Sequence, residues 1–395
     1  MLPNSLTFDP ARDSEFFATV PAKAAVFVLR GHEGEPYVSK SSNLRQRLQR
    51  LLGPTEGVSR RLNLREKART VEYALTGSDF ESGLLLYQVL RREFPKTYEG
   101  RLKFRYAPLV RLHMENACPR VSVTTRLGGA KSGSLYYGPF PSRVMAEKFA
   151  NDVLDFFKLR RCTDELNPDP AFPGCVYSEM KMCLAPCFKG CTDAEYATEA
   201  SRVRQFFDTG GDSLLKEIAA ERDHASAELH FETAAMLHAR LEKLKPVVAQ
   251  LPEIVRRVDQ LTALMIQPSA EPEHVTLFEV QGGRFSSPIQ LAVTQPQEAG
   301  SKPHSMEARI QELLATAPVP SGSAQETMEQ LAILKRWYYR TSKIGEIFFT
   351  DEHGELPWRR IVRAVSRVFK GEKAAGDLSE TAKDYWVMRE KLGNL

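Results

Sequence analysis

Short apolar runs alternate with helix-like segments through the first hundred residues. The pattern predicts two strands, a helix, a third strand and a second helix, over residues 24–29, 37–38, 43–53, 71–75 and 80–94. Asn43 is a favoured N-cap, and the leucines that follow it recur at helical spacing up to a Gly-Pro stop. We therefore expect a small mixed α/β domain over residues 1–103.

The rest of the chain continues with strands and then helices. The expected elements are strands over 109–113 and 121–125, a helix over 143–159, helices over 194–207 and 231–244, a hairpin of 275–279 with 289–294, and mixed pieces over 328–339 and 347–369. Pro, Ser, Gly and Ala dominate residues 296–325, which predicts a loosely ordered linker. The expected fold class is α+β multidomain, with further modules at 104–192, 193–250 and 251–395.

Basic residues are concentrated in one part of the chain. Lys and Arg number 54 against 50 Asp and Glu overall, but residues 40–126 hold 18 basic and 8 acidic side chains. A cation placed near a backbone phosphate releases condensed counterions, so a basic face of this kind suits nucleic acid. A solubilising face is the alternative that charge alone leaves open.

The composition is that of an ordinary globular protein, with 42% hydrophobic and 26% charged residues. A chain of 395 residues is expected to form two or three domains. No apolar run approaches the roughly 20 residues that cross a bilayer, and the first residues lack the pattern of a signal peptide. We therefore expect a cytoplasmic protein with no membrane partner.

Five of the six cysteines lie within thirty residues: Cys162, Cys175, Cys183, Cys187 and Cys191. A reducing compartment disfavours disulfides, so clustered thiols point to a metal. Four thiolates hold either an iron–sulfur cluster or tetrahedral zinc, and their spacing does not decide between these and buried thiols without metal. We expect Cys191 to be a spare thiol and Cys118 to pack as a small apolar residue.

Four segments of the N-terminal module carry a recognisable pattern: Ala25-Val26-Phe27, Tyr37-Val38-Ser39-Lys40, Asn43-Leu44-Arg45-Gln46-Arg47, and the run from Glu81 to Leu86 before Pro95. This pattern resembles the GIY-YIG nuclease domain of the UvrC family, the incision subunit of bacterial nucleotide excision repair. The resemblance implies that Tyr37 and Arg47 are retained catalytic positions. It also implies that DNA is bound by Lys40, Arg45, Arg47 and Arg50.

Two positions depart from the family pattern. The first-strand Tyr, which helps to activate water, falls on Phe27, and the Glu that ligates a divalent metal falls on Leu86. Phe has no hydroxyl, and Leu cannot bind a hard cation. Glu81 lies five residues earlier, about 140° around the helix, and is a poor substitute. The resemblance thus implies a degenerate domain, in which Mg²⁺ or Mn²⁺ binds only if nuclease activity survives.

The cysteine region resembles the stretch that follows the nuclease domain in UvrC chains. YYGPFPS (136–142), LRRC (159–162) and CLAPC (183–187) recur there. The family associates four cysteines at about this spacing with an iron–sulfur cluster. The resemblance therefore implies a four-iron four-sulfur cluster, with zinc as the alternative, held by Cys162, Cys175, Cys183 and Cys187.

Residues 231–237 (FETAAML) resemble the UVR motif, a helical hairpin by which UvrC meets the matching hairpin of UvrB. The Arg-Asp pair that commonly follows is His238-Ala239 here. On composition alone, a helix striped with Ala and Leu is simply core. The resemblance instead implies a UvrB-like partner that contacts Phe231, Glu232, Ala234, Ala235 and Leu237.

The resemblance extends to residues 331–340 and so covers nearly the whole chain. Full-length UvrC continues into an RNase H-like nuclease and a helix-hairpin-helix module, neither of which we expect in this chain. The resemblance implies a DNA-binding component of nucleotide excision repair that is weak or inactive in incision. One alternative is a Cho-like endonuclease that incises one strand 3′ to a lesion, and another is a protein that holds UvrB without touching DNA.

Overall fold

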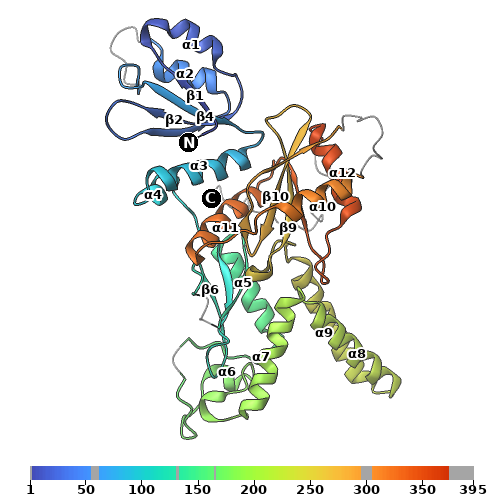
Figure 1. The fold of residues 1–395 in the computed structure, drawn as a ribbon. Coiled ribbons are helices and arrows are strands. Elements are labelled where there is room, and N and C mark those ends of the chain that lie inside the picture. The colour runs from blue at the N-terminus through green and yellow to red at the C-terminus, as the bar shows by residue number, and fades with distance from the viewer. Residues whose placement is uncertain (1, 55–61, 130–132, 164–165, 295–304, 373–395) are drawn as a thin grey trace, which may run out of the picture.

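The computed structural model describes residues 2–54, 62–129, 133–163, 166–294 and 305–372. Three antiparallel sheets carry helices on their faces, and a helical hairpin extends away from the body (Figure 1). This mixed architecture agrees with the expected α+β class. Within these ranges, no helix is long and apolar enough to span a membrane.

The N-terminal sheet has the strand order β1-β4-β2-β3. Residues of β2 alternate between its faces, so Phe27 packs toward α1 and α2 while Val26 and Val28 pack toward α3. Asn43 caps α2 by accepting a hydrogen bond from the Gln46 amide at 3.0 Å, as the sequence predicts. The elements are β1 (Asn4–Thr7), α1 (Asp13–Thr19), β2 (Ala25–Arg30), β3 (Tyr37–Ser41), α2 (Leu44–Leu52), β4 (Thr70–Leu75) and α3 (Asp79–Glu93).

A second sheet, in the order β6-β5-β7-β8, forms the middle of the molecule. The Tyr137 hydroxyl on β7 donates to Asp208 at 2.9 Å and so ties this sheet to α7. The two predicted strands near 110 and 122 are confirmed, whereas the helix predicted over 143–159 ends at residue 154. The elements are α4 (Tyr98–Leu102), β5 (Leu109–Leu112), β6 (Val121–Thr124), β7 (Leu135–Gly138), α5 (Arg143–Leu154), α6 (Val176–Glu179), α7 (Asp193–Asp208) and β8 (Arg256–Arg257).

The helices α8 (Asp212–Ala227) and α9 (Phe231–Ala249) form the projecting hairpin. They pack against each other through Leu214, Ile218 and Leu241. The sequence predicts that α9 ends near residue 244, but the helix continues through Pro246. A proline in a helix removes one i→i−4 hydrogen bond and crowds the carbonyl of residue i−4, which is why the sequence favours an earlier end.

The C-terminal sheet has the order β11-β10-β9-β13, and β12 pairs with the free half of β10. The predicted pairing of the segments near 275 and 290 is therefore confirmed. The prediction of a linker over 296–325 is wrong for residues 306–316, which form α10, and residues 296–304 lie outside the described ranges. Ser305 caps α10 and Ile310 is buried. The elements are β9 (Ala263–Pro268), β10 (His274–Gln281), β11 (Arg284–Phe285), β12 (Ile289–Ala292), α10 (Met306–Thr316), α11 (Ala324–Tyr338), β13 (Glu346–Phe349) and α12 (Trp358–Phe369).

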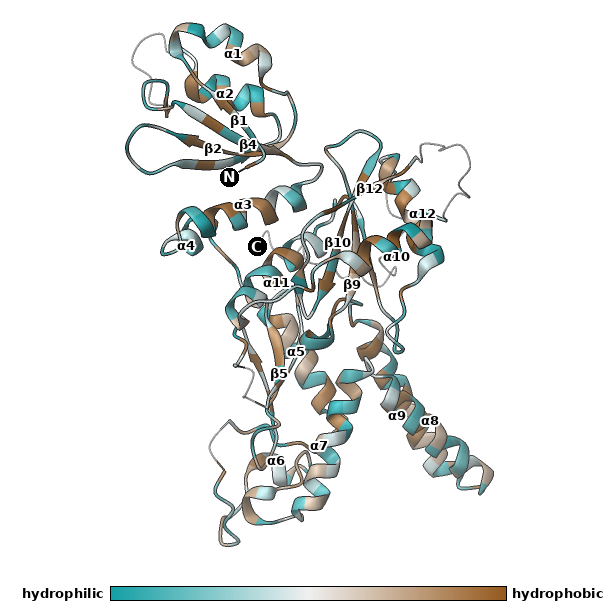
Figure 2. Cartoon of the chain, viewed as in Figure 1, coloured by the Kyte–Doolittle hydropathy of each residue, from teal (hydrophilic) through white to brown (hydrophobic). Residues whose placement is uncertain are grey.

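Helix α3 joins the N-terminal sheet to the C-terminal body, and its middle part is coloured as hydrophobic in Figure 2. The hydroxyls of Tyr87 on α3 and Tyr98 on α4 each donate to Glu329 of α11 at 2.7 Å. The Glu329 side chain is fully buried. One further residue of α3, Phe80, packs edge-on against three aromatic rings of the C-terminal body, those of Phe278, Phe285 and Trp337.

Candidate functional site

Phe27, Tyr37 and Arg47 lie together on the α2 side of the N-terminal sheet. The ring centroids of Phe27 and Tyr37 are 6.2 Å apart. Arg47 Nη2 donates a hydrogen bond to the Tyr37 hydroxyl at 2.9 Å. Arg47 Nε is buried and has no hydrogen-bond partner among the described residues. A buried guanidinium N–H without a partner is well suited to an anionic oxygen.

Leu86 lies on the other side of this sheet. It packs against the cluster that contains Val26 and Val28, together with Val38 of β3. Because successive strand residues face opposite sides, these valines and Phe27 point away from each other. The structure thus brings three of the four motif positions together and places Leu86 apart from them, in apolar surroundings.

Glu81, the nearest acidic residue before Leu86, has a local role at the start of α3. Its Oε2 accepts a hydrogen bond from the Gly77 amide at 2.7 Å. Burial raises the pKa of the Glu81 carboxyl above its ordinary value, against the opposing effect of this hydrogen bond. The Glu81 carboxyl is therefore committed to the turn that precedes the helix.

Lys40 points to the α3 side, where Val26 is its cross-strand neighbour. Its Nζ lies 2.5 Å from Asp79 Oδ1, and Arg340 Nη1 lies 2.5 Å from the other oxygen of Asp79. Burial alone would raise the pKa of Asp79, but the hydrogen bonds and charges of Lys40 and Arg340 hold it below its ordinary value. Asp79 follows the Ser78 N-cap and could be found as a first-turn acid, whereas no local signal points to Arg340.

The other two cations predicted to bind DNA differ in their surroundings. Arg45 Nε donates to the Val20 carbonyl at 2.7 Å and its Nη2 to the Ala18 carbonyl at 3.4 Å, so this side chain holds the loop before β2. Arg50 is exposed and forms no ion pair with a residue of the described ranges. Of the four predicted cations, Arg47 and Arg50 therefore remain the best placed to meet a phosphate.

The four predicted metal ligands lie around α6, at the end of the molecule farthest from the N-terminal sheet (Figure 1). All four thiols are free and half-buried. Burial raises the pKa of Cys183 to about 11, and the neighbouring thiols of Cys162, Cys187 and Cys175 contribute to the increase. A hydrogen bond from the Ala185 amide opposes this increase. The four sulfurs are therefore electrostatic neighbours, and their soft donor chemistry fits iron or zinc. Among the described residues, no three His, Cys, Asp or Glu side chains form a preformed metal site.

A buried arginine adjoins this cysteine cluster. Arg160 Nη1 lies 3.6 Å from Cys162 Sγ, and its Nε donates to the Cys118 carbonyl at 3.0 Å. Cys118 and Cys191 both pack against the main hydrophobic core, as small apolar residues do.

The residues predicted to bind a partner all lie in the first two turns of α9: Phe231, Glu232, Ala234, Ala235 and Leu237. The end of the hairpin exposes three large apolar side chains. Leu229 is 70%, Phe231 65% and Met236 67% exposed. The hairpin projects from the body, so another helical element has open access to it (Figure 1). Of these three side chains, Phe231 is the one that belongs to the predicted partner contacts.

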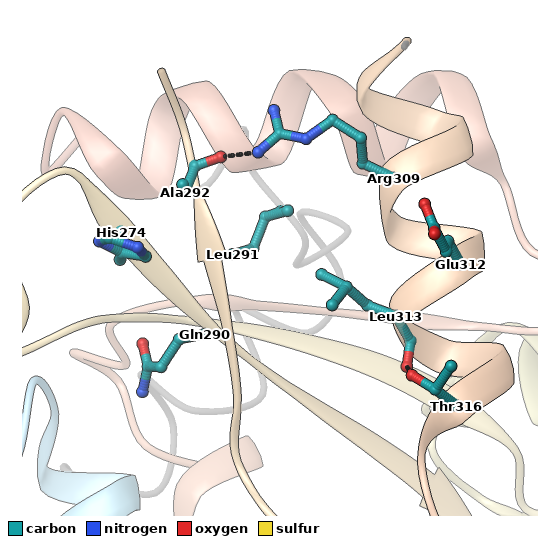
Figure 3. A pocket seen from close by; sticks show the side chains of 8 residues that line it. All are labelled: His274, Gln290, Leu291, Ala292, Arg309, Glu312, Leu313 and Thr316. Carbon is teal, nitrogen blue, oxygen red and sulfur yellow. Dashed lines mark hydrogen bonds between the residues drawn. The ribbon is translucent and has the colours of Figure 1, made fainter. Parts of the chain in front are cut away.

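Two cavities lie away from the predicted site residues. One, of about 430 Å³, lies between β12 and α10, where Arg309 donates to the Ala292 carbonyl at 2.5 Å (Figure 3). The other, of about 660 Å³, lies between α5 and α9. Neither is lined by a predicted site residue, so neither cavity contributes to the candidate site.

Residues 107–206 match the family model of the UvrC/Cho excinuclease middle domain. This stretch contains β5, β6, β7, α5 and all four predicted metal ligands. The class defined by fold and sequence is therefore an α+β protein built around that middle domain.

Longer relatives extend the match beyond this domain. The chain is 28% identical to the UvrABC system protein C of Natronomonas pharaonis, over 77% of this chain and 52% of the relative. The proteins of the same name from Carboxydothermus hydrogenoformans and Alcanivorax borkumensis are 29% and 28% identical, over 58% and 61% of this chain and 38% and 39% of theirs. The chain is therefore similar to the UvrC family over its middle domain and beyond it, and it spans about half or less of these relatives' length. No solved structure matches it.

Proposed function

We propose that this chain is a UvrC-like DNA-binding component of nucleotide excision repair, with a degenerate GIY-YIG domain that is weak or inactive in incision. The relatives named UvrABC system protein C support the repair role. The observation that carries DNA binding is the half-buried Arg47 guanidinium, which lies beside the Tyr37 hydroxyl and whose Nε–H has no partner among the described residues. A phosphate oxygen that meets the exposed part of this guanidinium would accept a charge-assisted hydrogen bond.

The weak incision follows from the surroundings of Leu86. Hydrolysis of a phosphodiester requires charge to be neutralised as the attacking oxygen approaches phosphorus. In the family, Mg²⁺ or Mn²⁺ supplies this as a Lewis acid. At position 86 an aliphatic side chain packs among Val26, Val28 and Val38, and none of these four side chains carries an oxygen donor for an ion. Tyr37 and Arg47 can therefore orient a phosphate without the group that activates its hydrolysis.

Binding and incision are tested separately on duplex DNA that carries a bulky lesion. Arg47→Ala should weaken binding and reduce the salt slope by about 1, because one phosphate contact is lost. Arg143→Ala, which removes an exposed arginine of α5, is the matched control. With Mg²⁺ or Mn²⁺, wild type should leave both strands intact. Binding that is insensitive to Arg47→Ala contradicts the proposal.

The retained hydrogen bond between Arg47 and Tyr37 favours one alternative, a Cho-like endonuclease that incises 3′ to the lesion. In that case a single nick forms with metal and disappears in Arg47→Ala. A third outcome, no DNA shift even at low salt, would leave a protein that only holds UvrB.

We also propose that the end of the α8–α9 hairpin binds a UvrB-like helical hairpin. Phe231 is the largest exposed apolar side chain among the predicted contacts. Truncating a central aromatic anchor typically costs tenfold or more in affinity. Phe231→Ala should weaken binding of UvrB by that factor in calorimetry. Val144→Ala, an equally exposed apolar residue on α5, should leave it unchanged.

We propose further that Cys162, Cys175, Cys183 and Cys187 hold an iron–sulfur cluster, with zinc as the alternative. This assignment is supported by the four free, half-buried thiols, which lie in one region of the molecule. Burial, and after it the neighbouring thiols, raise the pKa of Cys183 and Cys187, and a bound cation would offset this cost of forming thiolates. Anaerobically purified protein should be brown and contain about four iron atoms, or else be colourless with one zinc. Cys183→Ser should lose the metal, while Cys191→Ser should retain it.

A further inference from the structure

Helix α12 carries a second concentration of basic residues, outside the basic region at 40–126. Residues 358–370 contain four Arg, one Lys and no acidic residue. At 100° per residue, Arg359, Arg363 and Lys370 fall within about 40° of one another around the helix. We call these three residues the basic face of α12. The opposite side packs into the C-terminal core through Ile361, Ala364, Val365 and Val368.

The other two cations of this segment already have partners. Arg367 forms two hydrogen bonds with the Glu346 carboxylate on β13, at 2.9 and 2.8 Å. Arg360 lies over the Phe348 ring, with 5.5 Å between its Cζ and the ring centroid. The basic face is exposed, and within the described ranges it forms no ion pair or side-chain hydrogen bond. This differs from Arg45 of α2, which is committed to two backbone carbonyls within the protein.

The arrangement on α12 opposes helix stability in two ways. Arg359 and Arg363 are four residues apart, so like charges are neighbours on one face. Arg359 and Arg360 also lie in the first turn, where the helix dipole favours acidic residues and none is present. An anion held along this face would reverse both effects.

We infer that the basic face of α12 binds the phosphate backbone of duplex DNA. With a rise of 1.5 Å per residue, Arg359 and Lys370 are about 16 Å apart along the helix. Duplex DNA carries one negative charge per about 1.7 Å of its axis, so several phosphates lie within this span. Lys and Arg that meet phosphates fix position without reading sequence. The contact is therefore independent of sequence and of the lesion.

A lipid surface does not fit the same helix. Helices that lie on membranes insert an apolar side into the bilayer. The apolar side of α12 is already covered by β9 and β13 through residues such as Leu264 and Phe348. The inference rests on the proposed function only in taking DNA as the ligand. Helix α12 packs on the C-terminal sheet, whereas Arg47 lies on α2, which packs on the N-terminal sheet.

The test compares two triple variants of the full chain on an undamaged duplex, by fluorescence anisotropy between 50 and 200 mM salt. The first replaces Arg359, Arg363 and Lys370 by Gln. The control replaces three exposed cations on other helices by Gln and so makes the same change in net charge: Arg143, Lys148 and Lys216. The plot of log affinity against log salt should become shallower by about 2 to 3 for the first variant and by less than 1 for the control.

An equal change in both variants would overturn the inference, because it would reflect net charge alone. An unchanged slope in the α12 variant would also overturn the inference. This is the result expected if the basic face binds an acidic protein instead of DNA. Far-ultraviolet circular dichroism should be identical in all three proteins, since the replaced side chains are exposed. A second variant, Arg359→Lys with Arg363→Lys, should keep the wild-type slope.

The two DNA proposals fail separately. If Arg47→Ala leaves lesion binding intact while the α12 variant flattens the salt dependence, the proposed site at Arg47 is wrong and the inference about α12 stands. If instead Arg47→Ala weakens lesion binding and the α12 variant keeps the wild-type slope, the site at Arg47 stands and the inference about α12 is wrong.

Discussion

The buried carboxylate of Glu329 offers a direct measure of how firmly the N-terminal sheet is attached to the C-terminal body. Tyr87 donates to one of its oxygens and Tyr98 to the other, both at 2.7 Å, and Gln325 Nε2 adds a bond at 3.0 Å. Burial, together with the bond to Glu329, raises the pKa of both tyrosines well above the ordinary value. Both hydroxyls are therefore donors throughout the accessible pH range.

Removing either hydroxyl should lower the free energy of unfolding by about 1.5 to 3 kcal/mol, the contribution of a hydrogen bond to a charged group. Because the two hydroxyls serve different oxygens, Tyr87→Phe and Tyr98→Phe together should cost about 3 to 6 kcal/mol. The combined variant leaves a buried charge with Gln325 as its donor. Adding Glu329→Leu to this pair should restore much of the loss, because no buried charge then remains to be solvated.

Trp337 provides the readout, because its ring centroid lies 6.0 Å from that of Phe80 across the same interface. Urea unfolding is followed by tryptophan emission after the other two tryptophans are replaced by Phe. Tyr73→Phe is the matched control, since within the described ranges the Tyr73 hydroxyl forms no hydrogen bond. Losses below about 0.5 kcal/mol for both single variants, or a triple variant less stable than the double, would refute the reasoning.

Three further predictions concern local stability. The hydrogen bond from Arg30, opposed by burial, holds the pKa of Glu93 below its ordinary value of 4.5. The contribution of this ion pair to the free energy of unfolding is therefore fully present above pH 4.5 and is lost as the pH falls through the lowered pKa of Glu93. The difference in unfolding free energy between wild type and Arg30→Met should shrink in that acid range. Gly211→Ala should cost about 1 to 3 kcal/mol in thermal melts, because φ is +97° and a Cβ would lie 2.4 Å from a valine methyl, whereas Gly83→Ala has free space and should be neutral or stabilising. Asn43→Ala should cost about 1 kcal/mol through loss of the α2 cap, and Asn43→Asp should retain it.

The secondary-structure elements that the sequence predicts are those marked by local signals. The β2–β3 hairpin, α2 and α9 follow from short-range periodicity, caps and turns. Composition averaged over thirty residues does not predict α10, because the average conceals an eleven-residue amphipathic stretch behind Ser305. The full extent of α9 also escapes prediction, because proline usually ends a helix at the residue before it, and α9 continues through Pro246.

The candidate site is only partly predictable, for a different reason. Strand alternation alone separates Lys40 from Tyr37, since their sequence spacing is odd, and this separation can be derived from the sequence pattern. The partners of these cations cannot be derived in that way. Asp79 and Arg340 are 261 residues apart, and the donors to Glu329 come from the other end of the chain. Only tertiary packing decides which cations remain available to a ligand.

The surroundings of α3 connect the proposed loss of incision to the architecture. Leu86 packs against the N-terminal sheet, while its neighbour Tyr87 reaches Glu329 in the C-terminal body. A carboxylate at position 86 would have to leave water and enter the valine cluster around Val26, at a cost of several kcal/mol unless an ion compensated it. At this position, packing against the valine cluster and ligation of a metal therefore compete for the same side chain. The aliphatic residue favours the packed arrangement, and Arg47, the proposed phosphate-binding residue, lies on the opposite face of the sheet.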